Sequence, residues 1–160
     1  MSIKQKITPF LWFDSNAEEA MQLYVSLFEN SRIVEVTRCG DAGPGPRGTV
    51  MTGVFELEGQ RFIALNGGPM YKFTEAFSLV VDCETQEEVD RLWDRLIAGG
   101  GEPSQCGWLK DRFGLSWQII PGVLPKLLTD KDGAAAGRAM QAMLKMTKID
   151  IAALKRAFEG

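Results

Sequence analysis

Two amphipathic helices of the same design, 69 residues apart, constrain the fold of this chain more than any other feature of its sequence. The segment AEEAMQLYVSLF, which starts at Ala17, aligns with QEEVDRLWDRLI, which starts at Gln86. In both segments apolar residues recur at steps of three and four, and acidic residues stand where the helix dipole favours negative charge. Both also have the spacing of an N-terminal capping box, Ser15 with Glu18 and Thr85 with Glu88. The chain is therefore expected to contain one structural unit twice.

Strand-like runs surround each predicted helix in the same order. One run precedes each helix, at residues 7–14 and 76–82. RIVEVTRC, TVMTGVFELEG and RFIALN follow the first helix, whereas SQCGWLKD and GLSWQII follow the second, with a short strand expected near Glu102. Beyond Pro121, three segments with apolar stripes are predicted to be helices that serve as core or subunit contact. The sequence thus predicts an α+β fold with two βαβββ modules and C-terminal helices.

Composition excludes several classes of protein. With 160 residues, 45% of them hydrophobic and 24% charged, the chain fits an ordinary globular domain. A net charge of −3 and the lack of a Lys/Arg run argue against a nucleic-acid partner. No apolar run reaches the roughly 18 residues of a membrane span, and the N-terminus lacks the apolar stretch of a signal peptide. We therefore expect no membrane association and a cytoplasmic location.

Histidine is absent from the chain, which removes the commonest general base and the commonest metal ligand. The three cysteines are scattered and have neither a disulfide pattern nor zinc spacing. No histidine is available to activate the Cys106 thiol as a nucleophile, so a structural role is expected for it.

The glycine-rich stretch CGDAGPGPRG, residues 39–48, admits two interpretations. A phosphate-binding loop is one, but its prolines remove amide donors, no Lys-Ser/Thr follows, and a strand rather than a helix comes next. A hairpin connection between two strands is therefore the favoured interpretation.

The segments ITPFLWFDSNAEEAMQLYVSLFENSRI, FIALNGGP and DRFGLSWQIIP resemble the PhnB-like group of the vicinal oxygen chelate superfamily. This superfamily includes glyoxalase I, extradiol dioxygenases, fosfomycin resistance enzymes and bleomycin-binding proteins, and some PhnB-like members are labelled 3-demethylubiquinone 3-methyltransferases. The resemblance implies two modules, at about 5–70 and 75–122, that form curled mixed sheets around a cavity in a domain over residues 1–122. Residues 123–160 form a helical extension, and the family's habit implies a homodimer.

The same resemblance implies where a metal would be bound. In the last strand a glutamate ligand of the family stands where this chain has Gln118. Aligning Gly59 with Gly114 places Ile63 opposite Gln118 in the first module. The other two ligand positions fall near Thr8 or Pro9 and near Phe77 or Ser78. None of these residues is a strong ligand for a transition metal, so no metal and no other cofactor are expected.

Strand alternation predicts which side chains face the cavity. Gln118, Ser116 and Ile120 should share one face, with Leu115, Trp117 and Ile119 under the helix. The candidate ligand-binding residues are Phe10, Trp12, Asn66, Ser78, Trp108, Ser116 and Gln118. Alternatives stay open: Gln118 could bond only to Ser116, Ser78 or water, the two tryptophans could fill core space, and Asn66 could serve a turn.

The expected function is metal-independent binding of an apolar or aromatic small molecule. An enzyme on the same fold, an isomerase, lyase or transferase, is the alternative, and a packed structural protein is a third. The residues leave open whether there is catalysis. The glycine-rich stretch lacks the strand-to-helix setting of an S-adenosylmethionine site, so nothing in the residues supports methyl transfer.

Overall fold

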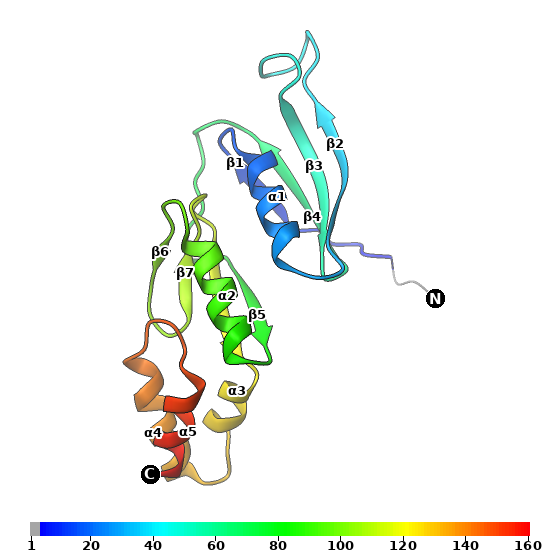
Figure 1. The fold of residues 1–160 in the computed structure, drawn as a ribbon. Helices are drawn as coiled ribbons and strands as arrows, with labels where there is room; N and C mark the ends of the chain where they lie inside the picture. The colour runs from blue at the N-terminus through cyan, green and yellow to red at the C-terminus, as the bar shows by residue number, and fades with distance from the viewer. Residues whose placement is uncertain (1–3) are drawn as a thin grey trace. The chain divides into compact units, whose positions relative to one another are not determined.

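The computed structural model describes residues 4–160 and divides the chain into two compact units, Met1–Lys72 and Phe73–Gly160. Each unit contains a four-stranded sheet with one helix between its first and second strands (Figure 1). The predicted duplication is therefore confirmed. No helix within residues 4–160 combines the length and apolar character needed to cross a membrane.

The first unit has the strand order β1-β4-β3-β2, in which β1 pairs with β4 in parallel and the other pairs are antiparallel. Its elements are β1 (Phe10–Phe13), α1 (Ala17–Leu27), β2 (Arg32–Arg38), β3 (Val50–Leu57) and β4 (Gln60–Asn66). The helix α1 covers one face of the sheet, where Tyr24 meets Phe55 and Phe55 stacks on Phe62 with ring centroids 5.3 Å apart. Leu11 and Phe13 are buried on this side.

Residues 39–49 connect β2 to β3, which pair antiparallel. The Cys39 N–H donates to the Thr49 carbonyl at 2.8 Å, and the Gly48 N–H donates to the Cys39 carbonyl at the same distance. The hairpin connection is therefore confirmed. A phosphate-binding loop would be followed by a helix, whereas the strand β3 follows this one.

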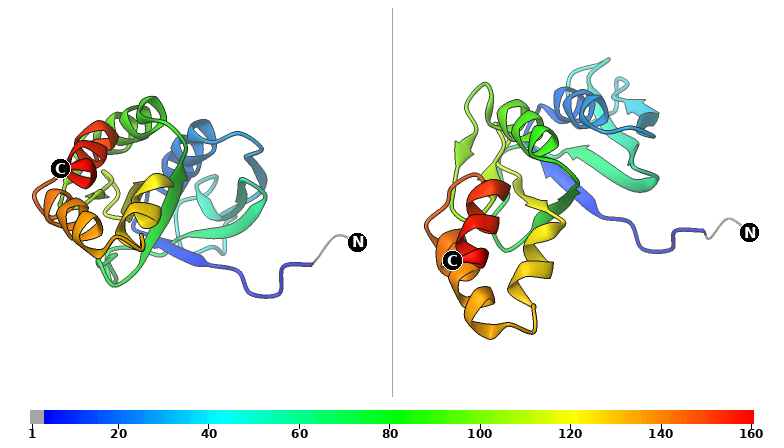
Figure 2. Two further views of the ribbon diagram at one scale, coloured as in Figure 1. Left: turned by 90° about the horizontal axis from the view of Figure 1, so that it is seen from below. Right: turned by 60° about the horizontal axis from the view of Figure 1, so that its bottom comes forward.

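The second unit repeats the topology with the order β5-β8-β7-β6 and a parallel β5–β8 pair. Its elements are β5 (Ser78–Cys83), α2 (Gln86–Ile97), β6 (Glu102–Pro103), β7 (Trp108–Lys110), β8 (Ser116–Pro121), α3 (Val123–Leu128), α4 (Gly133–Leu144) and α5 (Ile151–Glu159). The views in Figure 2 show the C-terminal helices grouped at one end of this unit. Ile63 pairs with Phe10 across the parallel pair of the first unit, and Gln118 pairs with Val80 across that of the second.

The two predicted capping boxes have different outcomes. Thr85 accepts a hydrogen bond from the Glu88 N–H, and Glu88 accepts one from the Glu84 N–H, so the box at α2 is confirmed. The box at α1 is wrong, because Asn16 rather than Ser15 precedes the helix and makes no side-chain cap. Glu18 instead forms an ion pair with Arg38 of β2 at 2.7 Å, so its carboxylate contacts a strand and does not cap its own helix.

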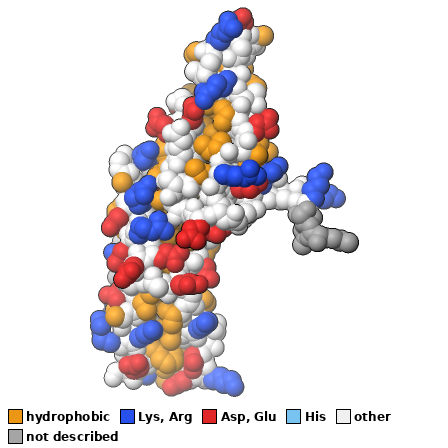
Figure 3. Space-filling model, turned by 45° about the vertical axis from the view of Figure 1, so that its right-hand side comes forward, with side chains coloured by type: hydrophobic (Ala, Val, Ile, Leu, Met, Phe, Trp, Pro, Cys, Tyr) orange, Lys and Arg blue, Asp and Glu red, His pale blue; other side chains and the backbone are white. Residues whose placement is uncertain are grey.

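Charged side chains of both signs are mixed over the face in Figure 3, with hydrophobic groups between them.

Asp111 holds the β7–β8 hairpin together. Its side chain is 2% exposed, its Oδ1 accepts from the Phe113 and Leu115 N–H groups at 2.9 and 3.1 Å, and its Oδ2 accepts from the Trp117 indole at 2.9 Å. Three donors around one buried carboxylate fix the turn and the position at which β8 begins.

We expect Asp111→Ala to lower the free energy of unfolding by about 3 kcal/mol or more, because it removes the acceptor from three donors, two of them buried. Chemical denaturation measures the change. Asp94→Ala, which removes an exposed carboxylate from α2, is the control and should change stability by less than about 0.5 kcal/mol. Equal effects of the two substitutions would contradict the role given to Asp111.

Candidate functional site

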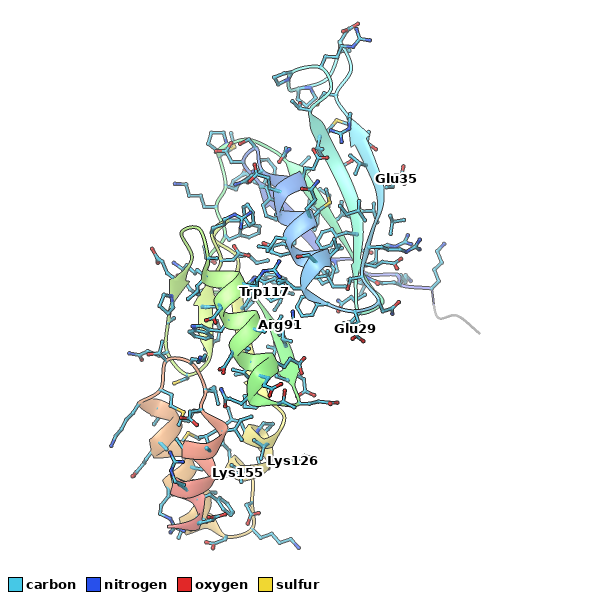
Figure 4. All side chains as sticks on the ribbon, viewed as in Figure 1. Glu29, Glu35, Arg91, Trp117, Lys126 and Lys155 are labelled. Atoms are coloured by element: carbon cyan, nitrogen blue, oxygen red, sulfur yellow. The ribbon has the colours of Figure 1, made fainter. Side chains whose placement is uncertain are left out.

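The sheet of the second unit has one face that α2 covers and one that it leaves uncovered. Leu109, Trp117 and Ile119 are at most 1% exposed on the face that α2 covers, and Figure 4 shows Trp117 beside this helix. The strand register places the alternate residues on the other side, which we call the open face: Ser78, Val80, Trp108, Lys110, Ser116 and Gln118. Gln118 therefore faces away from the helix, as alternation predicted.

Gln118 bonds across the parallel pair to β5. Its Nε2 donates to Ser78 Oγ at 2.9 Å, which fixes the amide orientation. Within residues 4–160 no hydrogen bond reaches its Oε1. The hydrogen bond from Gln118 to Ser78, which the sequence left as one alternative, is therefore present. The Oε1 of Gln118 remains as a hydrogen-bond acceptor on the open face.

Ser116 lies between Ser78 and Lys110 in the strand register. The residue is 1% exposed, yet its Oγ has no hydrogen-bond partner among the described residues. Leaving such a hydroxyl unpaired costs about 1–3 kcal/mol. Ser116 is thus a polar group that the fold buries at the open face without satisfying it.

Lys110 adds a positive charge beside Ser116. It pairs with Glu75, and the hydrogen bond between them holds the pKa of the Glu75 carboxyl below, and that of the Lys110 ammonium above, their usual ranges. Sequence reasoning missed Lys110 as a site residue. Its alternation with Trp108 in SQCGWLKD was the signal that could have found it.

Val80 and Trp108 flank Gln118 on the neighbouring strands. Val80 is 61% exposed and Trp108 is half-buried. An apolar side chain on either side of an amide gives this part of the open face both apolar surface and a hydrogen-bonding group. Such a combination suits a flat ligand with a polar edge.

Two candidates lie in the first unit, on the face away from α1. Phe10 is 55% exposed. The Trp12 indole donates to the Gly68 carbonyl at 3.0 Å and meets Tyr71 edge-on at 4.9 Å, and Gly67 lies so close to its ring that any side chain would overlap it. Trp12 therefore secures the turn after β4, and Phe10 is the freer of the two rings.

Asn66 is on the helix-covered side of the first sheet and is occupied by the protein itself. Its Oδ1 accepts from the Ala17 N–H at 2.8 Å, and its Nδ2 donates to the Val50 carbonyl at 3.0 Å. The amide thus joins the start of α1 to the start of β3. The structure brings four candidates together in the second unit, Ser78, Trp108, Ser116 and Gln118, and gives Asn66 a different task.

The residues at the family's metal positions do not fit a resident transition metal. The four places offer the hydroxyls of Thr8 and Ser78, the alkyl group of Ile63 and the amide of Gln118. Transition metals in proteins prefer imidazole, thiolate and carboxylate donors. Within residues 4–160 there is also no group of three or more His, Cys, Asp or Glu side chains that could hold an ion.

Two βαβββ modules with parallel outer pairs define the glyoxalase-like fold of the vicinal oxygen chelate proteins. Residues 5–120 match the model of the 3-demethylubiquinone-9 3-methyltransferase family, and the chain belongs to this family. None of the curated protein sequences compared with the chain matches it.

Solved structures agree with this assignment. A PhnB protein of Bacillus cereus, described as a 3-demethylubiquinone-9 3-methyltransferase, is 41% identical, with a TM-score of 0.69 over 74% of this chain and 100% of that one. A protein of Pseudomonas aeruginosa is 21% identical over 74% and 98%, with a TM-score of 0.61. The fosfomycin resistance protein FosX of Mesorhizobium loti is 13% identical over 81% and 100%, with a TM-score of 0.56. The last two show the fold alone.

We expect Asn66→Ala to destabilise the protein by about 1–3 kcal/mol, because it leaves the Ala17 N–H and the Val50 carbonyl without their partner. Thermal or chemical unfolding measures the loss. Asn16→Ala is the matched control, since Asn16 precedes α1 but makes no side-chain cap, and it should cost less than about 0.5 kcal/mol. A neutral Asn66→Ala would contradict the structural role of this amide.

Proposed function

We propose that the protein binds a flat aromatic small molecule that carries hydroxyl or carbonyl oxygens, on the open face of its second sheet and without a resident metal. The observation that carries the proposal is the buried Ser116 hydroxyl, which has no partner within the described chain. The hydroxyl is covered in the free protein, so a ligand oxygen would reach it by displacing a covering side chain, and would then recover the free energy that its unpaired burial costs.

The neighbouring groups favour an oxygen-bearing edge on the ligand. Ser116 can donate or accept, the Gln118 Oε1 can accept from a ligand hydroxyl, and Lys110 can donate to a ligand oxygen. Because these groups lie two residues apart along β8 or side by side across β7 and β8, one ligand edge can meet several of them. The exposed Val80 and the half-buried Trp108 would contact the ligand's apolar body.

The family name supports the same chemistry. A 3-demethylubiquinone is a quinone ring that bears a hydroxyl beside a carbonyl, so it combines a flat apolar body with adjacent oxygens. We take from this name only the class of ligand, an oxygenated aromatic ring, for this chain.

An enzyme acting on such a ligand is the second candidate, and the family name is the observation that favours it. Methyl transfer from S-adenosylmethionine would require a site of a different construction, because the glycine-rich residues 39–48 join two antiparallel strands instead of a strand and a helix. Conversion of a bound hydroxyaromatic compound, followed by chromatography, separates this candidate from simple binding.

The binding proposal predicts opposite effects of Ser116→Ala on stability and on affinity. Affinity for 1-naphthol, measured by calorimetry, should fall about fivefold, since one hydrogen bond is worth about 1 kcal/mol. The melting temperature of the free protein should stay level or rise, because the variant no longer buries an unpaired hydroxyl. Ser15→Ala, at an exposed position of the first unit, should change neither quantity.

Two further comparisons complete this test. The ring compound 1-methylnaphthalene has a methyl group in place of the hydroxyl, and it should bind more weakly than 1-naphthol. Addition of EDTA should leave 1-naphthol binding unchanged if no metal takes part. Equal affinity for the two compounds, full affinity in Ser116→Ala, or loss of binding in EDTA would each count against the proposal.

Homodimer formation is part of the proposal, and apolar exposure at a sheet edge supports it. The edge strand β1 and the residues before it expose Phe10 (55%) and Ile7 (85%), which a second copy could cover. Sedimentation should give about twice the 17.7 kDa chain mass, and the double substitution Ile7→Lys and Phe10→Lys should give the monomer. Leu144→Lys, which charges the exposed stripe of α4, should keep the dimer. A monomeric wild type, or dissociation by Leu144→Lys alone, would refute this arrangement.

A further inference from the structure

The C-terminal helices share a core with the second sheet. Leu124, Ile149 and Leu154 are at most 4% exposed and form the centre of a cluster, to which Ile120 of β8 contributes. Ile120 follows Gln118 by two residues and therefore lies on the same face of the strand. The open face thus passes directly from the Gln118 amide into the core of the C-terminal helices.

A second attachment joins these helices to the turn before β7. The Cys106 N–H donates to the Met146 carbonyl and the Gly107 N–H to the Thr147 carbonyl, both at 2.8 Å. Trp108 comes next along the chain, at the start of β7. The segment between α4 and α5 therefore fixes the turn from which the Trp108 ring extends.

Gly107 is packed too closely to move independently. It has φ +85°, and a Cβ there would stand 2.9 Å from Ile120 Cδ1 and 3.1 Å from Ile149 Cγ1. Its carbonyl accepts from the Ile119 N–H at 2.8 Å. One glycine thus joins the turn, the strand β8 and the C-terminal segment, and only a residue without a side chain fits.

Gln86 supplies the third attachment, from the first turn of α2. Its Nε2 donates to the Ile149 carbonyl at 3.0 Å, and its Oε1 accepts from the Ile151 N–H at 2.8 Å. The Lys148–Asp90 ion pair at 2.9 Å stands beside it. The segment is therefore held on one side by α2 and on the other by the turn before β7.

We infer that residues 123–160 are a positioning element for the ligand face, with Gln86 as the residue that fixes them. Through the Cys106–Gly107 turn and through Ile120, they determine where Trp108 and Gln118 stand. The family match ends at residue 120, so the inference concerns residues that this match does not include. For its ligand the inference rests on the proposed function.

The test loosens the segment at Gln86 and measures hydrogen exchange at the two amides it holds. Gln86→Met keeps the volume of the side chain but removes both hydrogen bonds to the segment. Exchange of the Cys106 and Gly107 amides, followed by NMR at residue resolution, should accelerate about fivefold for a local opening made easier by the loss. The Gly67 amide, which donates to Phe13 in the first unit, should be unaffected.

A second variant guards against simple misfolding of the first. Ile151→Pro removes the N–H that donates to Gln86 and replaces the partly buried isoleucine side chain. Ile151 is the first residue of α5, where proline is tolerated, and Asp150 before it is already extended. Gln141→Met is the matched control, because Gln141 is exposed on α4 and makes no hydrogen bond through its side chain. Asn66→Ala controls for loss of stability elsewhere.

The expected result is faster exchange at Cys106 and Gly107 in both loosened variants and in neither control, together with about fivefold weaker 1-naphthol binding by Gln86→Met. Unchanged exchange in both loosened variants, or equal acceleration in Asn66→Ala, would overturn the attachment. Faster exchange with unchanged 1-naphthol affinity would overturn the positioning role. If the wild type fails to bind 1-naphthol, the proposed ligand is refuted, and the exchange data still decide whether the segment holds the turn.

Discussion

The parallel pairing of β5 with β8 is the contact on which the candidate site depends. It sets Ser78 beside Ser116 and Val80 beside Gln118, and a shift of β8 by one residue would turn Ser116 and Gln118 under α2. Two features oppose such a shift. Trp117 fills the covered face at 1% exposure, and Asp111 binds its indole from the turn, so β8 can begin at only one residue. The composition of the open face is therefore a consequence of how the covered face is packed.

Asp111 and Ser116 show two different treatments of a buried polar side chain in the same hairpin. Asp111 has three donors, and its burial strengthens a turn. Ser116 is buried as deeply and has no hydrogen-bond partner in the described chain. The hydrogen bonds of Asp111 stabilise the fold and account for its burial. The unpaired hydroxyl of Ser116 lowers stability, and a hydrogen bond to a molecule outside the chain would account for its burial. This contrast is why the proposed ligand is placed at Ser116 and not at the better-connected Asn66.

Local patterns in the sequence were enough for the duplicated modules, for the β2–β3 hairpin and for the faces of β8, because helix periodicity and strand alternation are properties of short segments. Strand alternation also contained the signal for Lys110, whereas the remaining errors and omissions involve partners that are distant in the chain. Glu18 was expected to cap its own helix and pairs with Arg38 instead, and the two ends of the Asn66 amide meet residues 49 and 16 positions away. No local pattern contains such contacts, and the same holds for the bonds between Gln86 and the residues around Ile149.

The two modules differ in the length of one hairpin, and the C-terminal segment is bonded next to the shorter one. The second and third strands of the first module, β2 and β3, have 7 and 8 residues, whereas their counterparts β6 and β7 have 2 and 3. Such a short hairpin has few backbone hydrogen bonds of its own to hold its turn. The Met146 and Thr147 carbonyls supply two at Cys106 and Gly107, next to the shortened strands. The C-terminal segment thus supplies backbone hydrogen bonds that a longer β6–β7 hairpin would supply itself. These bonds lie directly before Trp108, at the start of β7.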